Sequence, residues 1–124
     1  MLLEGSLGAG KSTFARAVLV SLGVEQAPEG SPTFALAHEY SAPVGTIVHL
    51  DLYRLRSEDE IEVAGLHSYF WERETVTLVE WASLWPIFER EIASPNGRAK
   101  VYRVTLKHGT SDDVRDLQID LISD

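Results

Sequence analysis

The feature that most constrains this chain is a glycine-bordered octapeptide, Gly5 to Ser12, which reads GSLGAGKS. Two glycines five residues apart, followed at once by Lys and Ser, have the spacing of a phosphate-binding loop. Glycine lets successive backbone N–H groups turn inward around an anion, where a larger side chain would strain the backbone or block the approach. The motif therefore predicts a site for the phosphates of a nucleoside triphosphate.

The residues on either side of the octapeptide have the order that such a loop requires. Residues 1–4 are typical of the end of a strand, and residues 13–19 predict a helix because their apolar side chains recur at three-to-four spacing. Ser12 would open this helix and offer its hydroxyl to Mg²⁺, while the helix N-terminus adds about half a positive charge. Lys11 adds a full charge at the same place.

Length and charge limit what else the chain can do. Its 124 residues predict a single domain, residues 1–124. The 11 Lys and Arg against 19 Asp and Glu give a formal net charge of −8, which disfavours direct binding to nucleic acid. The absence of cysteine excludes disulfides and thiolate ligands. No apolar run is long enough for a membrane span and no leader is recognisable, so the cytoplasm is the expected location.

The rest of the sequence predicts an α/β fold. We expect a mixed sheet with flanking helices, like that of P-loop nucleoside triphosphatases, with antiparallel strands at the C-terminal end. The short turn at residues 41–45 predicts that the strands it joins are antiparallel. The predicted strands are residues 34–40, 46–51, 75–79, 100–107 and 116–121. The predicted helices cover residues 87–93 and residues 58–66, where Gly65 weakens or ends the helix.

Two carboxylates end apolar strands and are candidates for the site. Glu80 follows residues 76–79 and Asp51 follows residues 47–50. Ligands gather at the carboxyl ends of strands in open α/β sheets, so either side chain could reach a Mg²⁺ bound by Ser12. The alternative is that each carboxylate caps a turn or pairs with an arginine, either Arg54 or Arg73.

Other residues leave two interpretations open. Thr33 follows Ser-Pro in a connector that could supply a hydroxyl to the γ-phosphate or to Mg²⁺, or could be a plain proline turn. Trp81 could stack on a base, but packing in the core is the usual role of a tryptophan. His49 lies within a strand and is expected to be packed. Arg54 could stabilise phosphoryl charge or pair with the acidic helix that follows it.

Taken in order, five segments form a recognisable set: GAGKST at 8–13, SPTF at 31–34, HEY at 38–40, HLDLYR at 49–54 and VEW at 79–81. In this set the chain resembles the TsaE (YjeE) family, bacterial ATPases of threonylcarbamoyladenosine tRNA modification. The resemblance covers residues 3–81. The chain departs from it in having Ser6 where the family usually has Asp, Ser12 where it usually has Thr, and fewer residues before the loop, which suggests that the family's N-terminal segment is missing here.

The resemblance implies an ATP-binding and ATP-hydrolysing protein that works with the TsaD and TsaB subunits and meets tRNA only through them. It implies that Ser12 and Glu80 hold Mg²⁺ and that Asp51 is required for hydrolysis, with Lys11 on the phosphates and Thr33 in a switch-like segment. The residues expected to contact ATP are Leu7, Gly8, Ala9, Gly10, Lys11, Ser12 and Thr13.

Three other functions share the loop. A small-molecule kinase would need an acceptor pocket and a mobile lid, for which the chain has little room. A GTPase is disfavoured because no Asn-Lys-x-Asp segment occurs in the sequence. A docking module, in which ATP merely orders residues 31–40 for a partner, would need no hydrolysis at all.

Overall fold

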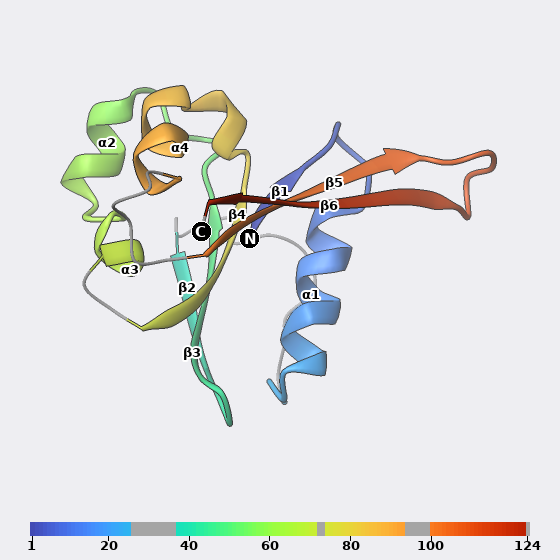
Figure 1. The fold of residues 1–124 in the computed structure, drawn as a ribbon, viewed down its shortest axis with the longest axis horizontal. Helices are drawn as coiled ribbons and strands as arrows, with labels where there is room; N and C mark the ends of the chain where they lie inside the picture. Colours follow the sequence, from blue (N-terminus) through green and yellow to red (C-terminus); the bar gives the residue numbers. More distant parts are fainter. Residues whose placement is uncertain (26–36, 72–73, 94–99, 124) are drawn as a thin grey trace.

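The computed structural model describes residues 1–25, 37–71, 74–93 and 100–123. Helices cover both faces of a six-stranded sheet (Figure 1). None of the helices in these ranges has the length and apolarity that crossing a lipid bilayer would require. The elements in chain order are β1 (Leu2–Glu4), α1 (Lys11–Ser21), β2 (Ala37–Ala42), β3 (Gly45–Asp51), α2 (Glu58–Val63), α3 (Ser68–Trp71), β4 (Thr75–Glu80), the 3₁₀ turn η1 (Ala82–Leu84), α4 (Pro86–Ile92), β5 (Val101–His108) and β6 (Arg115–Ser123).

The sheet is mixed, with the strand order β2-β3-β4-β1-β5-β6. The four inner strands run parallel, since β1 pairs in parallel with β4 and β5, and β3 with β4. The two edge strands are antiparallel to their neighbours: β2 pairs with β3 and β6 with β5. The predicted α/β class, with its antiparallel C-terminal strands, is confirmed. The antiparallel pairing of the two strands joined by the short turn is also confirmed.

Each face of the sheet buries its own apolar cluster, because successive residues of a strand point to opposite faces. On one face α1 packs its Ala15 and Leu19 against residues from four parallel strands. On the other face α2, α3 and α4 contribute Ile61, Phe70 and Phe88 to a larger cluster. Alternation along β3 decides which side chains face α1: the odd-numbered residues do, as Ile47 shows, whereas Val48 and Leu50 belong to the opposite cluster.

The interruption predicted at Gly65 is confirmed. The helix predicted over residues 58–66 ends as α2 at Val63, and a separate turn of helix, α3, follows. Gly65 has φ 69°, a left-handed conformation that glycine adopts without steric strain, and it ends the first helix. The strand predicted from residue 34 is described from Ala37 onward as β2, while residues 34–36 lie outside the described ranges.

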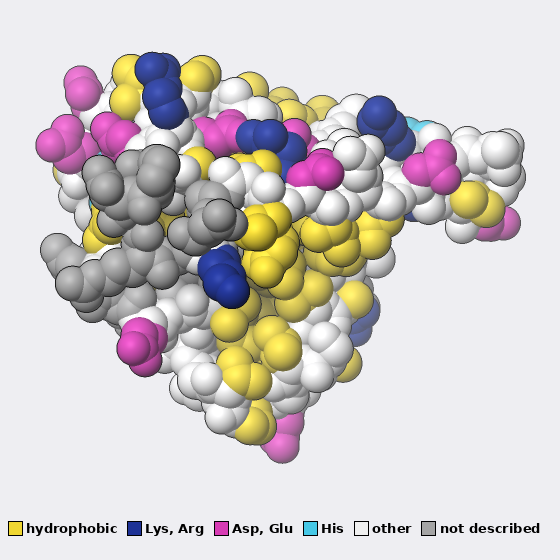
Figure 2. Space-filling model, in the orientation of Figure 1, with side chains coloured by type: hydrophobic (Ala, Val, Ile, Leu, Met, Phe, Trp, Pro, Cys, Tyr) yellow, Lys and Arg dark blue, Asp and Glu magenta, His cyan; other side chains and the backbone are white. Residues whose placement is uncertain are grey.

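The hairpin of β5 and β6 extends away from the body of the molecule (Figure 1). The outer strand β6 exposes Leu117, Ile119 and Leu121, which share the α1 side of the sheet with Val104 of β5. Figure 2 shows apolar side chains gathered beneath the hairpin, towards α1. The β6 strand thus adds little to the buried core, and its alternating polar residues face the other side.

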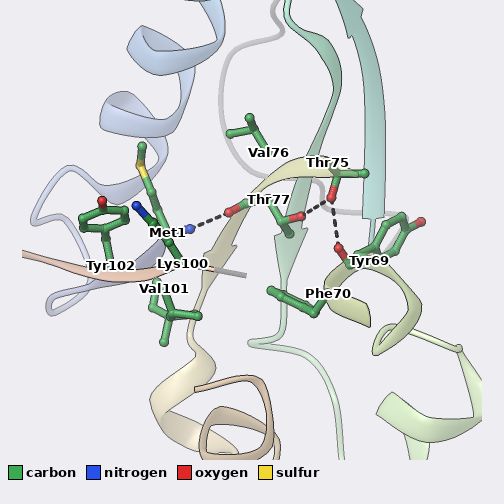
Figure 3. A pocket seen from close by; sticks show the side chains of 10 residues that line it. Met1, Tyr69, Phe70, Thr75, Val76, Thr77, Lys100, Val101 and Tyr102 are labelled. Atoms are coloured by element: carbon green, nitrogen blue, oxygen red, sulfur yellow. Dashed lines mark hydrogen bonds between the residues drawn. The ribbon is translucent and has the colours of Figure 1, made fainter. Parts of the chain in front are cut away.

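A pocket of about 270 Å³ lies at the amino ends of the parallel strands, between β1, β4, α3 and β5 (Figure 3). Its wall is mainly apolar and includes Phe70, Val76 and Val101. The α-amino group of Met1 lies at this pocket and donates to the Thr77 carbonyl oxygen at 2.6 Å. Burial lowers the pKa of this amino group from 8.0 to about 6, because burial disfavours its charged form.

The Met1 amino group gives the 124-residue chain a pH-dependent stability. Because its folded pKa lies near 6 and its ordinary value is 8.0, the unfolded chain binds more protons in this interval and stability rises with pH. The stabilisation is complete above pH 8 and is lost as the pH falls to 6. We expect a difference on the order of 2 kcal/mol in unfolding free energy between these limits.

Urea unfolding of the free and the Nα-acetylated chain from pH 5.5 to pH 8.5 measures this effect. Acetylation removes the titration but leaves all other groups in place, so the difference between the two pH profiles isolates Met1. Parallel profiles would contradict the assignment.

Candidate functional site

The glycine-rich loop, residues 5–12, joins β1 to α1 at the carboxyl edge of the parallel strands. Gly5, Gly8 and Gly10 have φ values of 151°, 79° and 105°, in the range that other residues adopt only with strain. At Gly5 the backbone also approaches β5, because a Cβ built there would lie 2.6 Å from the Leu106 carbonyl oxygen. The sequence places glycine where the loop conformation demands it.

The three glycines do not have equal roles, and substitution should separate them. Gly5→Ala places a methyl group against the Leu106 carbonyl oxygen and 3.0 Å from the Ala9 Cβ, so we expect unfolding free energy to fall by about 2–3 kcal/mol. Gly8→Ala is the matched control, since a Cβ there meets no described atom within 4 Å, and strain alone should lower stability by about 1 kcal/mol. Equal losses on urea unfolding would contradict the close contact.

Lys11 is the first residue of α1 and is almost fully buried, with 5% of its surface exposed. Its Nζ donates to the carbonyl oxygens of Gly5 at 2.6 Å and Ser6 at 3.1 Å, and it lies 4.0 Å from the centre of the Trp81 ring. Burial lowers the pKa of Lys11, while the charges of Glu80 and Asp51 oppose that shift. The ammonium group and both predicted carboxylates therefore share one electrostatic environment.

The N-terminus of α1 is open to an anion. Gly10 caps the helix, no side-chain cap is found among the described residues, and the first turn carries no acidic side chain. The first N–H groups of a helix have no partner within the helix, and the macrodipole places partial positive charge there. Of the other residues predicted to contact a nucleotide, Leu7, Gly8 and Thr13 are exposed and Ala9 is buried.

Ser12, Glu80 and His49 form a hydrogen-bonded chain beside the loop. The Ser12 hydroxyl donates to Glu80 Oε1 at 3.0 Å, with Oε2 at 3.3 Å. His49 Nε2 lies 2.6 Å from Glu80 Oε2, and both residues are 2% exposed. The carboxylate is directed at the first turn of α1.

Strand register explains why these residues meet. Asp51 is the register partner of Glu80 on the neighbouring parallel strand, and both are the last residues of their strands. His49 and Asp51 are odd-numbered residues of β3, so they share the face on which α1 packs, and Glu80 shares that face with Leu78 of β4. The carboxyl ends of two adjacent strands and the start of α1 are thus brought together.

Asp51 also makes the turn contact that the sequence offered as the alternative. Its Oδ1 accepts the backbone N–H of Tyr53 at 3.0 Å, two residues further along the chain. This Asx-type turn begins the loop after β3 and fixes the carboxylate at the edge of the sheet. The contact gives Oδ1 a structural role as a turn cap and does not involve Oδ2.

Trp81 follows Glu80 in a left-handed conformation, with φ 67° and ψ 25°. This is the only non-glycine residue with positive φ in the parts of the chain that the structure describes. Such strain costs on the order of 1–3 kcal/mol and tends to occur at functional sites. The Trp81 ring packs partly against the core and also contacts the Tyr53 ring at a centroid distance of 4.9 Å. Packing in the core, the role predicted for Trp81, therefore accounts for only some of its contacts.

Sequence reasoning missed two residues of this site. His49 was expected to be merely packed; its signal was its place two residues before Asp51, on the same face of the strand. Arg115 of β6 donates to loop carbonyl oxygens, Nε to Ala9 at 3.2 Å and Nη2 to Gly8 at 3.5 Å. Nothing local in the sequence indicated this long-range contact. The predicted Thr33 lies outside the described residues.

Glu80 and Ser12 offer a carboxylate and a hydroxyl oxygen, the kind of ligand that Mg²⁺ prefers. Within the described ranges no cluster of three or more His, Asp and Glu side chains has the arrangement of a metal site. A pair of protein oxygens nevertheless suits Mg²⁺, which usually keeps several waters and takes other ligands from phosphates. The residues present therefore fit that ion better than one that needs a full protein cage.

Comparison with known proteins gives an independent result. The family model described as "Threonylcarbamoyl adenosine biosynthesis protein TsaE" matches residues 1–116. Curated TsaE proteins are similar to this chain: that of Bacillus subtilis is 46% identical over 82 residues, 66% of this chain and 49% of that protein. That of Haemophilus influenzae is 41% identical over 80 residues, covering 64% and 49%. The match to the Aquifex aeolicus TsaE is 37% identical over 107 residues, covering 82% and 74%.

A solved structure agrees with these matches. The crystal structure of Bacillus subtilis YdiB superposes with a TM-score of 0.67 at 29% identity, covering 98% of this chain and 66% of that one. The chain spans about half the length of the first two curated relatives. The family model, the curated relatives and the fold agree, and the chain belongs to the TsaE family.

Proposed function

We propose that this protein binds Mg²⁺ and ATP at the glycine-rich loop and hydrolyses ATP as a component of tRNA threonylcarbamoyladenosine biosynthesis. The observation that carries the proposal is the meeting of three features at one edge of the sheet. These are the loop with its open helix N-terminus, the buried Lys11, and the Ser12 hydroxyl 3.0 Å from Glu80. Membership of the TsaE family supports the part of the proposal that concerns threonylcarbamoyladenosine biosynthesis.

In this proposal each residue has a distinct task. Backbone N–H groups of the loop and Lys11 bind the phosphates, and Lys11 exchanges its contacts with the Gly5 and Ser6 carbonyl oxygens for phosphate oxygens. Ser12 and Glu80 would hold Mg²⁺, with His49 fixing the carboxylate from behind. When bound, Mg²⁺ would neutralise negative charge on the phosphate oxygens. Asp51 orients or deprotonates the attacking water.

The proposed partners rest on the family resemblance, and the net charge supports how they are used. The protein would act with the TsaD and TsaB subunits in the cytoplasm, and its ATP cycle would let that complex modify adenosine repeatedly. The net charge of −8 favours contact with tRNA through these subunits rather than directly. Hydrolysis by the isolated chain is expected to be slow, because charge-stabilising groups supplied by a partner are worth about 10³–10⁵ in rate.

Reconstitution tests the proposal. The chain is mixed with TsaD, TsaB, substrate tRNA, Mg²⁺ and an excess of a preformed activated threonylcarbamoyl donor, with ATP or a non-hydrolysable analogue, and the number of modified adenosines per complex is counted. We expect several cycles with ATP, and no more than one with the analogue or without the chain. An unchanged cycle number on adding the chain, together with no stimulation of its ATPase at saturating partner concentrations, would refute the proposal.

A second candidate function is a docking module that binds ATP without essential hydrolysis. The hydrogen bond from the Tyr53 N–H to Asp51 favours it, since that contact gives the carboxylate a structural role. In the reconstitution above, a docking module would support repeated modification with the non-hydrolysable analogue as well as with ATP.

A further inference from the structure

Arg115 joins the β5–β6 hairpin to the glycine-rich loop. It is the first residue of β6, and its guanidinium donates to four backbone carbonyl oxygens. Two of these belong to its own hairpin, Asp112 at 2.6 Å and Val114 at 3.0 Å. The other two belong to the apex of the loop, Ala9 at 3.2 Å and Gly8 at 3.5 Å. The rigid, planar guanidinium of Arg115 therefore bridges the glycine-rich loop and the hairpin.

Close packing does not fix the two glycines that flank the loop apex. Gly8 and Gly10 have positive φ, and a Cβ at either position would meet no atom within 4 Å among the described residues. Glycine has the largest backbone freedom to lose on ordering. Ala9 between them is buried, and Gly5 at the base of the loop is confined by the Leu106 carbonyl oxygen. Arg115 thus holds the carbonyl oxygens of an apex in which only Ala9 is closely packed.

Because peptide groups are planar, the contacts of Arg115 with two carbonyl oxygens also fix the direction of the backbone N–H groups that follow them. In a trans peptide the C=O of one residue and the N–H of the next point in opposite directions. Holding the Gly8 and Ala9 carbonyl oxygens towards the hairpin turns the N–H groups of Ala9 and Gly10 to the other side of the loop. The Ala9 N–H accordingly donates across the loop to the Ser6 carbonyl oxygen at 3.0 Å.

We propose that Arg115 is a positioning residue of the nucleotide site, which holds the loop apex in its phosphate-binding conformation before the nucleotide arrives. This inference rests on the proposed function, since it assigns the anion as the phosphates of ATP. Its physical effect is preorganisation: a loop already ordered loses less conformational entropy on binding. The positive charge of Arg115 adds a favourable field, but the two-carbonyl contact is the essential part.

The test compares variants on the same hairpin. Arg115→Gln removes the planar guanidinium and its positive charge. Lys107→Gln is the matched control, because it removes one positive charge from an exposed position on β5. We expect ATP and ADP affinity, measured by calorimetry with Mg²⁺, to fall about tenfold in Arg115→Gln. The affinity of the control should stay within about twofold of the parent chain, because exposed charges contribute little.

Arg115→Lys keeps the positive charge but lacks the planar guanidinium. Its ATP affinity should remain at least about threefold weaker than that of the parent.

A second measurement needs no nucleotide. Hydrogen exchange at residues 8–10 should be faster in Arg115→Gln than in the parent or in Lys107→Gln, with urea unfolding midpoints unchanged. Parent-like affinity and exchange in Arg115→Gln, or full recovery of affinity in Arg115→Lys, would overturn the inference. If the parent chain itself binds no ATP, the proposed function fails, while the exchange result separately reports whether Arg115 orders the loop.

Discussion

Replacing His49 by Leu is expected to lower the unfolding free energy by about 3 kcal/mol, a large effect for one side chain. His49 Nε2 lies 2.6 Å from Glu80 Oε2, and both side chains are buried. Removing His49 leaves the Glu80 carboxylate buried with one hydrogen bond lost. The free-energy penalty of such a buried group is much larger than the net stabilisation that the intact pair contributes. Urea unfolding followed by tryptophan fluorescence measures the change.

Two further variants separate this effect from simple loss of packing. His49→Gln keeps an N–H donor near the Nε2 position and should recover part of the stability. The double variant His49→Leu, Glu80→Met replaces both polar groups by apolar ones, and we expect it to be more stable than His49→Leu alone. A loss below about 1 kcal/mol in His49→Leu would be within the range of ordinary substitutions and would contradict a coupled buried pair.

Asp51→Asn is expected to reduce ATP hydrolysis by about 10²–10⁴, the usual contribution of a positioned acid or base. The substitution is nearly isosteric, and the Asn carbonyl oxygen can still accept the N–H of Tyr53, so the turn after β3 should persist. ATP binding should therefore change by less than about threefold, since Lys11 and the loop are untouched. Single-turnover hydrolysis and calorimetry on the same preparation measure the two quantities.

A matched control for Asp51→Asn is Asp59→Asn, which removes one negative charge from an exposed position on α2. It should leave hydrolysis unchanged. If Asp51 serves only as a turn cap, Asp51→Asn would hydrolyse ATP at the parent rate, which would contradict its role in hydrolysis. If the protein is a docking module, Asp51→Asn would keep both ATP-dependent partner binding and repeated adenosine modification. Loss of repeated modification with partner binding intact would instead support hydrolysis as the essential step.

The sheet and the predicted carboxylates could be anticipated because they follow from local patterns. Glycine spacing and a helix-forming run define the loop, and a polar residue that ends an apolar strand lies at the edge of a parallel sheet. Asp51 and Glu80 are at this edge for that reason. They are register partners because β3 and β4 are also neighbours in the sheet, which local patterns do not specify.

The remaining contacts depend on packing that local patterns do not encode. A histidine inside an apolar strand has the same sequence environment whether it fills the core or supports a carboxylate. The place of His49 two residues before Asp51 therefore indicated which face of the strand it shares, but not its contact with Glu80. Arg115 reaches a loop 106 residues earlier in the chain, since the strand order places β5 beside β1. The division between α2 and α3, by contrast, was indicated by the sequence, because it lies at Gly65, which adopts a left-handed conformation.

Calorimetric titration of the chain with ATP in the presence of Mg²⁺ tests the central claim most directly, with Lys11→Met as the comparison. Lys11 lies in the loop between the Gly5 and Ser6 carbonyl oxygens, where it can meet a phosphate. The account predicts saturable binding of one ATP per chain, weakened at least about tenfold in Lys11→Met because a charge-assisted contact is lost. No heat of binding in the parent chain, or equal affinity in the two proteins, would contradict it.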